Sequence, residues 1–255
     1  MPLPIGIEAR PETRSRRGVV SSLLRDRTAL VGLVLVSLFV MIGCIAPLIV
    51  GHDPNLIDAM RRLEGPSRMH PFGTDNLGRD TFSRIVYGAR WSLGAVAIAT
   101  ALIMSIGVGV GTLAGYFGGL IDEVLMRVVD VLLAFPSFLL AIAIAGMLGP
   151  GMASVIIALV SVWWASYARI VRGMVLSLRH REFVAAAKSL GADDVHIVFH
   201  HVLPNILAPV AILATVEMGE LILAVAGLGF LGIGVQSPTP EWGTMVNDGR
   251  SYIMS

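Results

Sequence analysis

Long apolar runs without a charged residue dominate the pattern of this chain. They cover residues 28–50, 91–121, 131–168 and 206–216, and the last continues past two glutamates to about residue 235. A membrane-spanning helix needs about 20 apolar residues, so each run is long enough to cross a bilayer. The run 131–168 is too long for one crossing and is broken by Leu-Gly-Pro-Gly at 148–151, which predicts a hairpin of two spans. We therefore predict five spans near residues 28–50, 92–117, 131–148, 152–169 and 206–234.

Composition agrees with a chain whose solvent is the membrane. Hydrophobic residues make up 55% of the sequence and charged residues 15%, with a mean hydropathy of +0.77, which excludes an ordinary soluble domain of this length. The net charge of +1 gives no indication of nucleic-acid binding. Cys44 is the single cysteine, so an internal disulfide and a cysteine metal cluster are both excluded.

Basic residues indicate the orientation. Six arginines precede the first apolar run, and this run is longer than the core of a cleavable signal peptide and lacks a small-residue cleavage pattern after it. With the N-terminus inside, twelve basic residues lie in inner segments and seven in outer ones, as the positive-inside rule favours. We predict a cytoplasmic tail at 1–27 and a transmembrane domain at 28–255, with an outer loop at 51–91 and a cytoplasmic loop at 170–205.

The predicted cytoplasmic loop has a helix-turn-helix pattern. Residues 182–190 are rich in alanine and favour a helix, which Gly191 can end in a left-handed turn. Residues 193–202 then form a short amphipathic stretch, and Pro204 is expected to close it before the next span. The small alanines allow a partner to approach closely, and an apolar docking face is predicted from Phe183, Val184 and Leu190.

This loop resembles a known motif. Ala185-Ala-Ala-Lys-Ser-Leu-Gly191, followed by Val202-Leu-Pro204, is similar to the EAA loop of ABC importer permeases, which in that family is the coupling helix seated in a cleft of the ATPase subunit. Ala185 stands where the family has glutamate, so the ion pair of relatives is absent or is replaced through Glu182. The resemblance implies that ATPase coupling involves Glu182, Phe183, Ala185, Ala186, Ala187, Gly191, Leu203 and Pro204.

Three further segments resemble the C-type permease of the dipeptide, oligopeptide and nickel branch. They are residues 70–80 continuing to 87–93, residues 116–122 with 127–136, and residues 230–243. The resemblance, which covers about residues 25–255, implies an all-α permease in a bacterial inner membrane that pairs with a homologous second permease. It also implies two ATPase subunits that hold ATP and Mg²⁺, and an extracytoplasmic substrate-binding protein.

The family has six spans, of which five are visible here. Dipeptides or oligopeptides are the first candidates for substrate, with nickel chelates, glutathione and haem left open.

The outer loop carries a Gly-Thr-Asp motif made of Gly73, Thr74, Asp75, Gly78, Arg79 and Asp80. Thr74 or Asp75 can cap a helix, and Asp75 with Arg79 and Asp80 with Arg84 have the spacing of ion pairs on a helix. One interpretation is a solvated helix on the outer surface. The other is a loop that helps to dock the substrate-binding protein.

Two glycine series occur in the predicted spans. Gly107, Gly111 and Gly115 recur every four residues, which favours close helix packing. The denser series at residues 227, 229, 232 and 234 allows either packing or the bending of an outer gate.

Glu217 and Glu220 lie three residues apart in an otherwise apolar run. A charge at mid-membrane costs about 2.5 to 3.5 kcal/mol or more, so these residues either line the translocation path or are neutralised by protonation or by the sister subunit.

The sequence contains no catalytic signature. The single lysine, Lys188, follows Ala187, so there is no P-loop, and no metalloprotease or hydrolase motif occurs. We therefore predict a transporter subunit that is not an enzyme and binds no metal or cofactor of its own. His200 and His201 are expected to contact the ATPase or lipid headgroups. The alternatives are an ion-coupled secondary transporter that uses Glu217 and Glu220, and a passive membrane scaffold.

Overall fold

A computed structural model of the chain describes residues 27–50 and 53–252, which form helices, turns and loops with one isolated bridge between Thr74 and Asp80. The chain divides into two units, residues 1–41 and 42–255, and each is described by itself. In the first unit the described residues begin the apolar helix α2 (Arg27–Ile49). The predicted cytoplasmic tail at 1–27 lies almost entirely outside the described residues.

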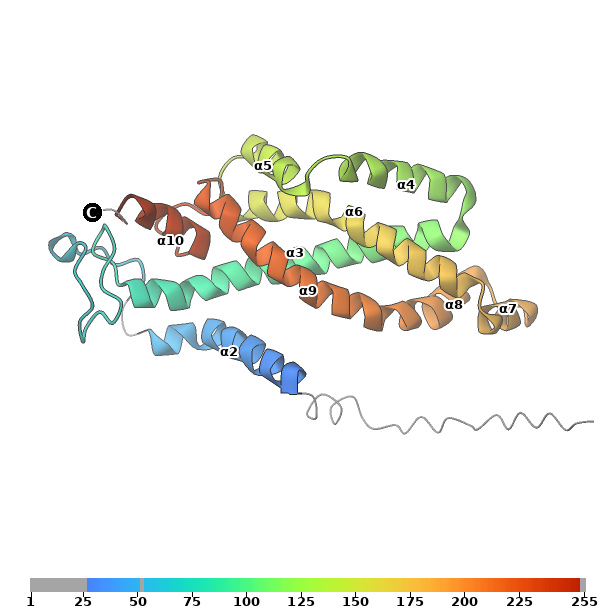
Figure 1. The fold of residues 1–255 in the computed structure, drawn as a ribbon, viewed down its shortest axis with the longest axis horizontal. Helices are drawn as coiled ribbons and strands as arrows, with labels where there is room; N and C mark the ends of the chain where they lie inside the picture. The colour runs from blue at the N-terminus through green and yellow to red at the C-terminus, as the bar shows by residue number, and fades with distance from the viewer. Residues whose placement is uncertain (1–26, 51–52, 253–255) are drawn as a thin grey trace, which may run out of the picture. The chain divides into compact units, whose positions relative to one another are not determined.

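Three long helices form the centre of the second unit (Figure 1). They are α3 (Thr81–Phe117), α6 (Met152–Arg179) and α9 (Leu203–Phe230). α3 packs most extensively against α6, and α9 lies against both. Buried apolar side chains from all three helices form one core, which includes Ile103, Leu159, Leu221 and Leu228.

The contact between α3 and α6 depends on glycine, as predicted. A Cβ atom placed on Gly107 would lie 2.5 Å from the Cβ atom of Tyr167, and one on Gly111 would lie 2.6 Å from the carbonyl oxygen of Ala168. At Gly115 the nearest atom is the Arg172 carbonyl oxygen, at 2.8 Å. These distances leave no space for a side chain, so the three glycines set how closely the helices approach.

Residues 131–148 do not form one continuous helix, as the predicted span required. The structure has α4 (Gly119–Leu133) and α5 (Ser137–Leu148), bent by 87° at the break between them. Pro136 is the N-cap of α5; it cannot donate to a helical hydrogen bond, and it disfavours helical geometry at the residue before it. The turn between α5 and α6 was predicted correctly, because Gly149 and Gly151 both have positive φ angles there.

Four helices of the described residues are long and apolar enough to cross a membrane, or five if the bent pair α4 and α5 is one span. Two of them extend past the predicted spans: α3 begins at Thr81, inside the predicted outer loop, and α6 continues to Arg179, inside the predicted cytoplasmic loop. The predicted spans stop where the uncharged runs of the sequence stop. The structure instead pairs Arg169 with Asp130 and Arg172 with Asp122, both on α4, so helix and charge coexist.

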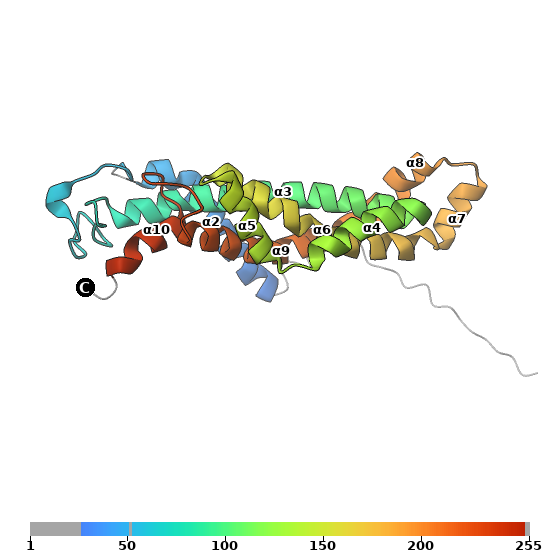
Figure 2. The same ribbon diagram turned by 90° about the horizontal axis from the view of Figure 1, so that it is seen from above.

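Short elements lie at the two ends of the second unit (Figures 1 and 2). One end, the α7 end, carries α7 (Glu182–Ser189), α8 (Asp194–Ile197) and the π-turn η2 (Val198–Val202). The opposite end, the α10 end, carries the 3-10 turns η1 (Ala59–Arg61) and η3 (Arg250–Tyr252) and the helix α10 (Trp242–Gly249).

Candidate functional site

The α7 end contains the residues predicted to couple to an ATPase. α7 begins with Glu182 and has Lys188 in its last turn, the charge order that a helix dipole favours. Gly191, with φ of 85°, then makes the left-handed turn predicted from the sequence, and the Ala192 N–H donates to the Ala187 carbonyl at 3.1 Å. The Asp193 carboxylate accepts a 3.0 Å bond from the His196 N–H and so caps α8.

One face of α7 is anchored and the opposite face is exposed. Val184 is buried with Ile197, Val202 and Ile206 against α3 and α6, so it does not belong to the predicted docking face. The outward face carries small or apolar side chains and one acid. Its exposed residues include Glu182, Phe183, Ala185, Ala186, Ser189 and Leu190.

Pro204 does not end the second helix, contrary to our prediction. η2 widens the helix by one residue, with the Leu203 N–H bonded to the Val198 carbonyl, and Pro204 then lies in the first turn of α9. Proline has no N–H to donate, and the first turn of a helix tolerates it. Of the predicted coupling residues, Leu203 and Ala187 pack against the same buried cluster, whereas Pro204 is exposed.

A polar contact links α8 to the end of α3. The Tyr116 hydroxyl donates to Asp194 Oδ1 at 2.7 Å, Arg179 Nη1 donates to the Tyr116 carbonyl at 2.9 Å, and Lys188 Nζ lies 3.9 Å from Asp194. These side chains border a cavity of about 410 Å³ beneath α7. Nearby, the rings of His196 and His200 stack at 4.2 Å, and His201 lies 6.3 Å from the Phe183 ring. The expected contact of the histidines with a partner stays a prediction.

The Gly-Thr-Asp motif forms a tight loop at the α10 end, and not the solvated helix of the first interpretation. Neither Thr74 nor Asp75 caps a helix: Thr74 bonds to the Arg61 carbonyl and the Glu64 N–H. Gly73 and Gly78 have positive φ angles, and a Cβ on Gly78 would lie 1.7 Å from the Asp58 carbonyl oxygen. The loop therefore packs on its own backbone.

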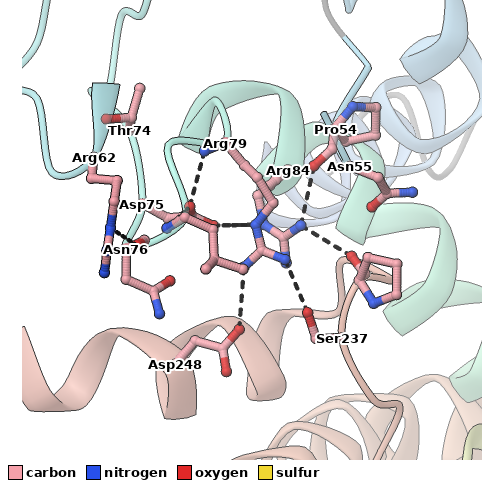
Figure 3. Close-up of polar contacts among 12 residues, drawn as sticks. Pro54, Asn55, Arg62, Thr74, Asp75, Asn76, Arg79, Arg84, Ser237 and Asp248 are labelled. Atoms are coloured by element: carbon pink, nitrogen blue, oxygen red, sulfur yellow. Dashed lines mark hydrogen bonds and ion pairs between the residues drawn. The ribbon is translucent and has the colours of Figure 1, made fainter. Parts of the chain in front are cut away.

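Two arginines are buried under this loop (Figure 3). Arg79 Nε pairs with Asp75 Oδ2 at 2.6 Å, as predicted, and its other nitrogens reach Ser237 Oγ at 3.0 Å and Asp248 at 3.5 Å. Arg84 does not pair with Asp80. It lies 3.5 Å from Asp75 and donates to the carbonyl groups of Pro54 and Pro238, both at 3.1 Å. The network thus joins the loop to α10 and to the segment before it.

Asp80 has a different role from the one predicted. It is the N-cap of α3, accepts a 2.7 Å bond from the Ser83 N–H and lies 3.0 Å from His70 Nδ1. Burial alone would raise the pKa of Asp80, but the hydrogen bonds from Ser83 and the His70 ring outweigh it and hold the pKa below its ordinary value. The carboxylate is therefore kept charged in the folded protein.

Sequence reasoning missed two acidic residues at this end. Glu241 is buried, caps α10 through the N–H groups of Gly243 and Thr244, and accepts a 3.0 Å bond from Ser92 of α3. Asp248 completes the arginine network. The signal for Glu241 was an acid directly before a short amphipathic stretch, as at many helix starts, whereas Asp248 could be recognised only in the fold.

The denser glycine series lies where α9 meets α10. A Cβ on Gly229 would be 2.4 Å from Glu241 Oε2, and one on Gly243 of α10 would be 2.1 Å from the Ala226 carbonyl oxygen. These contacts favour the packing interpretation at Gly229. The outer gate stays a prediction.

Glu217 and Glu220 lie in the middle of α9, one partly buried and the other exposed. Within residues 27–50 and 53–252 neither carboxylate takes part in an ion pair. The same part of the chain contains no group of three or more His, Cys, Asp or Glu residues that could hold a metal ion.

Comparison with known proteins shows where this arrangement recurs. Residues 107–254 match the family of binding-protein-dependent transport system inner membrane components, and residues 16–66 match the N-terminal transmembrane domain of oligopeptide transport permease C. The MetNI methionine ABC transporter, solved in inward-facing conformations, has a similar fold with a TM-score of 0.56 at 20% identity, over 68% of this chain and 81% of that one.

Curated relatives are similar over most of the chain. The dipeptide transport system permease protein DppC of Alkalihalophilus pseudofirmus is 46% identical over 94% of this chain and 79% of its own length. The nickel transport system permease protein NikC of Escherichia coli (strain K12) is 42% identical over 87% of this chain and 80% of its own length. The glutathione transport system permease protein GsiD of Pectobacterium atrosepticum is 42% identical over 89% and 76%.

Fold, membrane-spanning helices and matches together define the membrane subunit of a binding-protein-dependent ABC importer. The chain belongs to the C-type permease subunits of the dipeptide, oligopeptide and nickel importer family. The comparisons do not support the alternative of an ion-coupled secondary transporter.

Proposed function

We propose that this permease forms half of a peptide import path and that α7 is its coupling helix to a separate ATPase. The observation that carries the proposal is the pair of faces on α7, one anchored through Val184 and the other exposed and small-sided. Alanines at the outward face let a partner's backbone approach, and Phe183, which is 41% exposed, can fill an apolar pocket.

The link to the membrane helices gives the coupling a mechanical route. A movement of α7 is transmitted to α6 through the buried cluster that contains Val184. A movement of α8 is transmitted to α3 through the hydrogen bond between Asp194 and Tyr116. α3 and α6 are closely packed at Gly107, Gly111 and Gly115, so they respond as one body. ATP binding must then favour one orientation of the path by a few kcal/mol to drive transport.

The partners follow from this scheme. A second, homologous permease completes the path, two ATPase subunits hold ATP and Mg²⁺, and an extracytoplasmic binding protein delivers the substrate. The α7 end then faces the cytoplasm, together with the N-terminal tail, and the α10 end faces outward. The rigid loop of Gly73, Thr74, Asp75, Gly78, Arg79 and Asp80 lies at the outward end, where it supports docking of the binding protein.

A peptide is the substrate that the relatives favour. Relatives at 40 to 46% identity include the permease of a dipeptide transport system and one named as the probable permease of a D,D-dipeptide transport system. Glutathione, itself a small peptide, is the substrate named for another. The nickel relative makes a chelated metal the second candidate.

The first test is affinity purification of the tagged chain from its native membrane in mild detergent, followed by mass spectrometry. We expect a second permease and P-loop ATPases to be recovered. Recovery of the chain alone would contradict the proposal.

The second test places a charge on the outward face of α7. Ala186→Glu should leave membrane insertion intact but lower peptide uptake at least about tenfold, because an unpaired carboxylate would be desolvated in the ATPase cleft. Met60→Glu is the matched control, since Met60 is 91% exposed on the opposite end. Equal uptake by both variants would argue against α7 as the coupling helix.

A further inference from the structure

The cavity beneath α7 carries more positive than negative charge. Its volume of about 410 Å³ lies in the range of ligand pockets, about 300 to 1,000 Å³. The residues that line it include two cations, Arg179 and Lys188, and one acid, Asp194. Two cations and one carboxylate give the lining a net charge of +1, so the cavity favours an anionic ligand.

Arg179 is the cation with free capacity in this cavity. The Asp194 carboxylate already accepts a 2.7 Å hydrogen bond from the Tyr116 hydroxyl and lies 3.9 Å from Lys188 Nζ. Arg179 donates to the Tyr116 carbonyl oxygen at 2.9 Å, and it takes part in no ion pair within the part of the chain that the structure describes. A guanidinium has five N–H donors in a planar fork that matches the oxygens of a phosphate.

The cavity lies where an apolar surface meets a charged one. Phe117, which also lines the cavity, is 46% exposed, and Leu120, just after the turn at Gly118, is 76% exposed. A Cβ atom on Gly118 would lie 3.1 Å from Arg179 Nη1, so the guanidinium lies against this turn. In a membrane permease, large exposed apolar side chains beside basic ones mark the boundary between hydrocarbon and water. The cavity is therefore at the level of the lipid headgroups.

We propose that this cavity binds the phosphate group of an anionic phospholipid, with Arg179 and Lys188 as the residues that hold it. Basic pockets between membrane helices bind anionic headgroups in this way. The phosphate offers only acceptor oxygens to the two cations, and its negative charge matches the net charge of the lining. Phe117 and Leu120 are placed to contact the acyl chains. This site goes beyond the proposed function, because it does not depend on the transported substrate.

A bound phosphate joins two parts of the α7 end. Arg179 lies in the last turn of α6, whereas Lys188 lies in the last turn of α7. A phosphate between them holds α7 to a membrane helix through charge, in addition to the apolar contact made by Val184. We therefore expect an anionic lipid to stabilise the folded transporter.

Lipid retention by the complete transporter is the first test. The complex is purified in mild detergent with added phosphatidylglycerol, and native mass spectrometry measures the lipid that stays bound. Retention should fall at least about tenfold in Arg179→Gln with Lys188→Gln, because each basic residue near the headgroup adds to the attraction. Lys188→Gln alone should also lower it, and this variant leaves the bond between Arg179 and Tyr116 intact. Arg181→Gln is the matched control and should retain the lipid, since Arg181 is an exposed cation of the same end that does not line the cavity.

Thermal unfolding distinguishes a lipid from a free phosphate. A ligand that binds only the folded protein raises the thermal midpoint. Phosphatidylglycerol should raise the midpoint of the delipidated wild-type complex, whereas the zwitterionic phosphatidylcholine and inorganic phosphate should raise it far less. The double glutamine variant should not respond to phosphatidylglycerol.

Three results would overturn the proposal. Equal retention of phosphatidylglycerol by wild type and the double variant would show that the two cations do not hold it. A midpoint raised as much by inorganic phosphate as by the lipid would show a free phosphate to be the ligand. Loss of the ATPase subunits from the double variant, with an unchanged response to phosphatidylglycerol, would show that the cations contact the ATPase.

Discussion

Arg79 and Arg84 are the largest fully buried side chains in the described part of the chain, each 1% exposed. Sequence spacing predicted the partner of Arg79 but not the partners of Arg84. Arg84 donates to the carbonyl group of Pro54, 30 positions before it, and to that of Pro238, 154 positions after it. Burying two cations is costly unless each is paired and hydrogen-bonded. The loop above them is therefore held by its contacts with α10 and not by local helix propensity.

Asp80 gives the loop a pH dependence. Its pKa is below the ordinary aspartate value of 3.8, so the charged form contributes stability above that value, and the contribution is lost as the pH falls from there through the folded-state pKa. We expect Asp80→Asn to lower the thermal midpoint of the purified complex at neutral pH. The difference from wild type should shrink below about pH 3.8.

Asp193→Asn is the control for this measurement, since Asp193 is an exposed aspartate that caps α8 in the same way. Its effect should be smaller than that of the Asp80 variant at neutral pH. A difference between wild type and Asp80→Asn that stays constant from pH 7 to pH 3 would contradict the assignment.

Among the elements, α3 and α6 share the most extensive contact of the second unit. Their glycines were recognised from the spacing alone, because a repeat of four brings small residues to one face of a helix. The partner helix was not evident from the spacing. α6 is apolar on several sides, and its buried face includes Ala168 and Val171, which contact Gly111.

Gly111→Ala tests this contact. The added Cβ would lie 2.6 Å from a backbone carbonyl oxygen, so the helices must separate, and overpacking of this kind typically costs about 1 to 3 kcal/mol. We expect a lower thermal midpoint and weaker uptake. The control is Gly109→Ala on the same helix, where no atom lies within 4 Å of the new Cβ and alanine favours the helix by about 1 kcal/mol. A Gly111→Ala variant as stable as the Gly109→Ala variant would show that the contact between α3 and α6 tolerates a methyl group, which contradicts the packing assignment.

At the scale of the whole molecule, orientation in the membrane decides which end meets the ATPase. Placing the α7 end in the cytoplasm puts the arginines near α6's last turns on the inner side, as the positive-inside rule favours. It also places the α10 end, with its buried ion network, toward the substrate-binding protein.

Cysteine labelling tests this orientation. In a Cys44→Ala background, Ser67→Cys places an exposed thiol at the α10 end and Ser189→Cys places one at the α7 end. A membrane-impermeant maleimide should label the first in intact spheroplasts and the second only after the membrane is opened. The reverse pattern would invert the topology and remove the basis for α7 as an ATPase contact.

The sequence by itself determined the all-helical membrane class, the position of most spans, the glycine seam of α3, the helix and turn at residues 182–191, and the family. These features depend on local composition and spacing, which act through hydrophobic length and helix geometry. Only the tertiary structure decided the bend at Pro136, the continuation of α9 through Pro204, the burial of Val184 and the partners of Arg84 and Asp80. The burial of Val184 and the partners of Arg84 depend on contacts between residues far apart in the sequence. A local pattern shows that a proline is present, but not whether the helix bends or continues there.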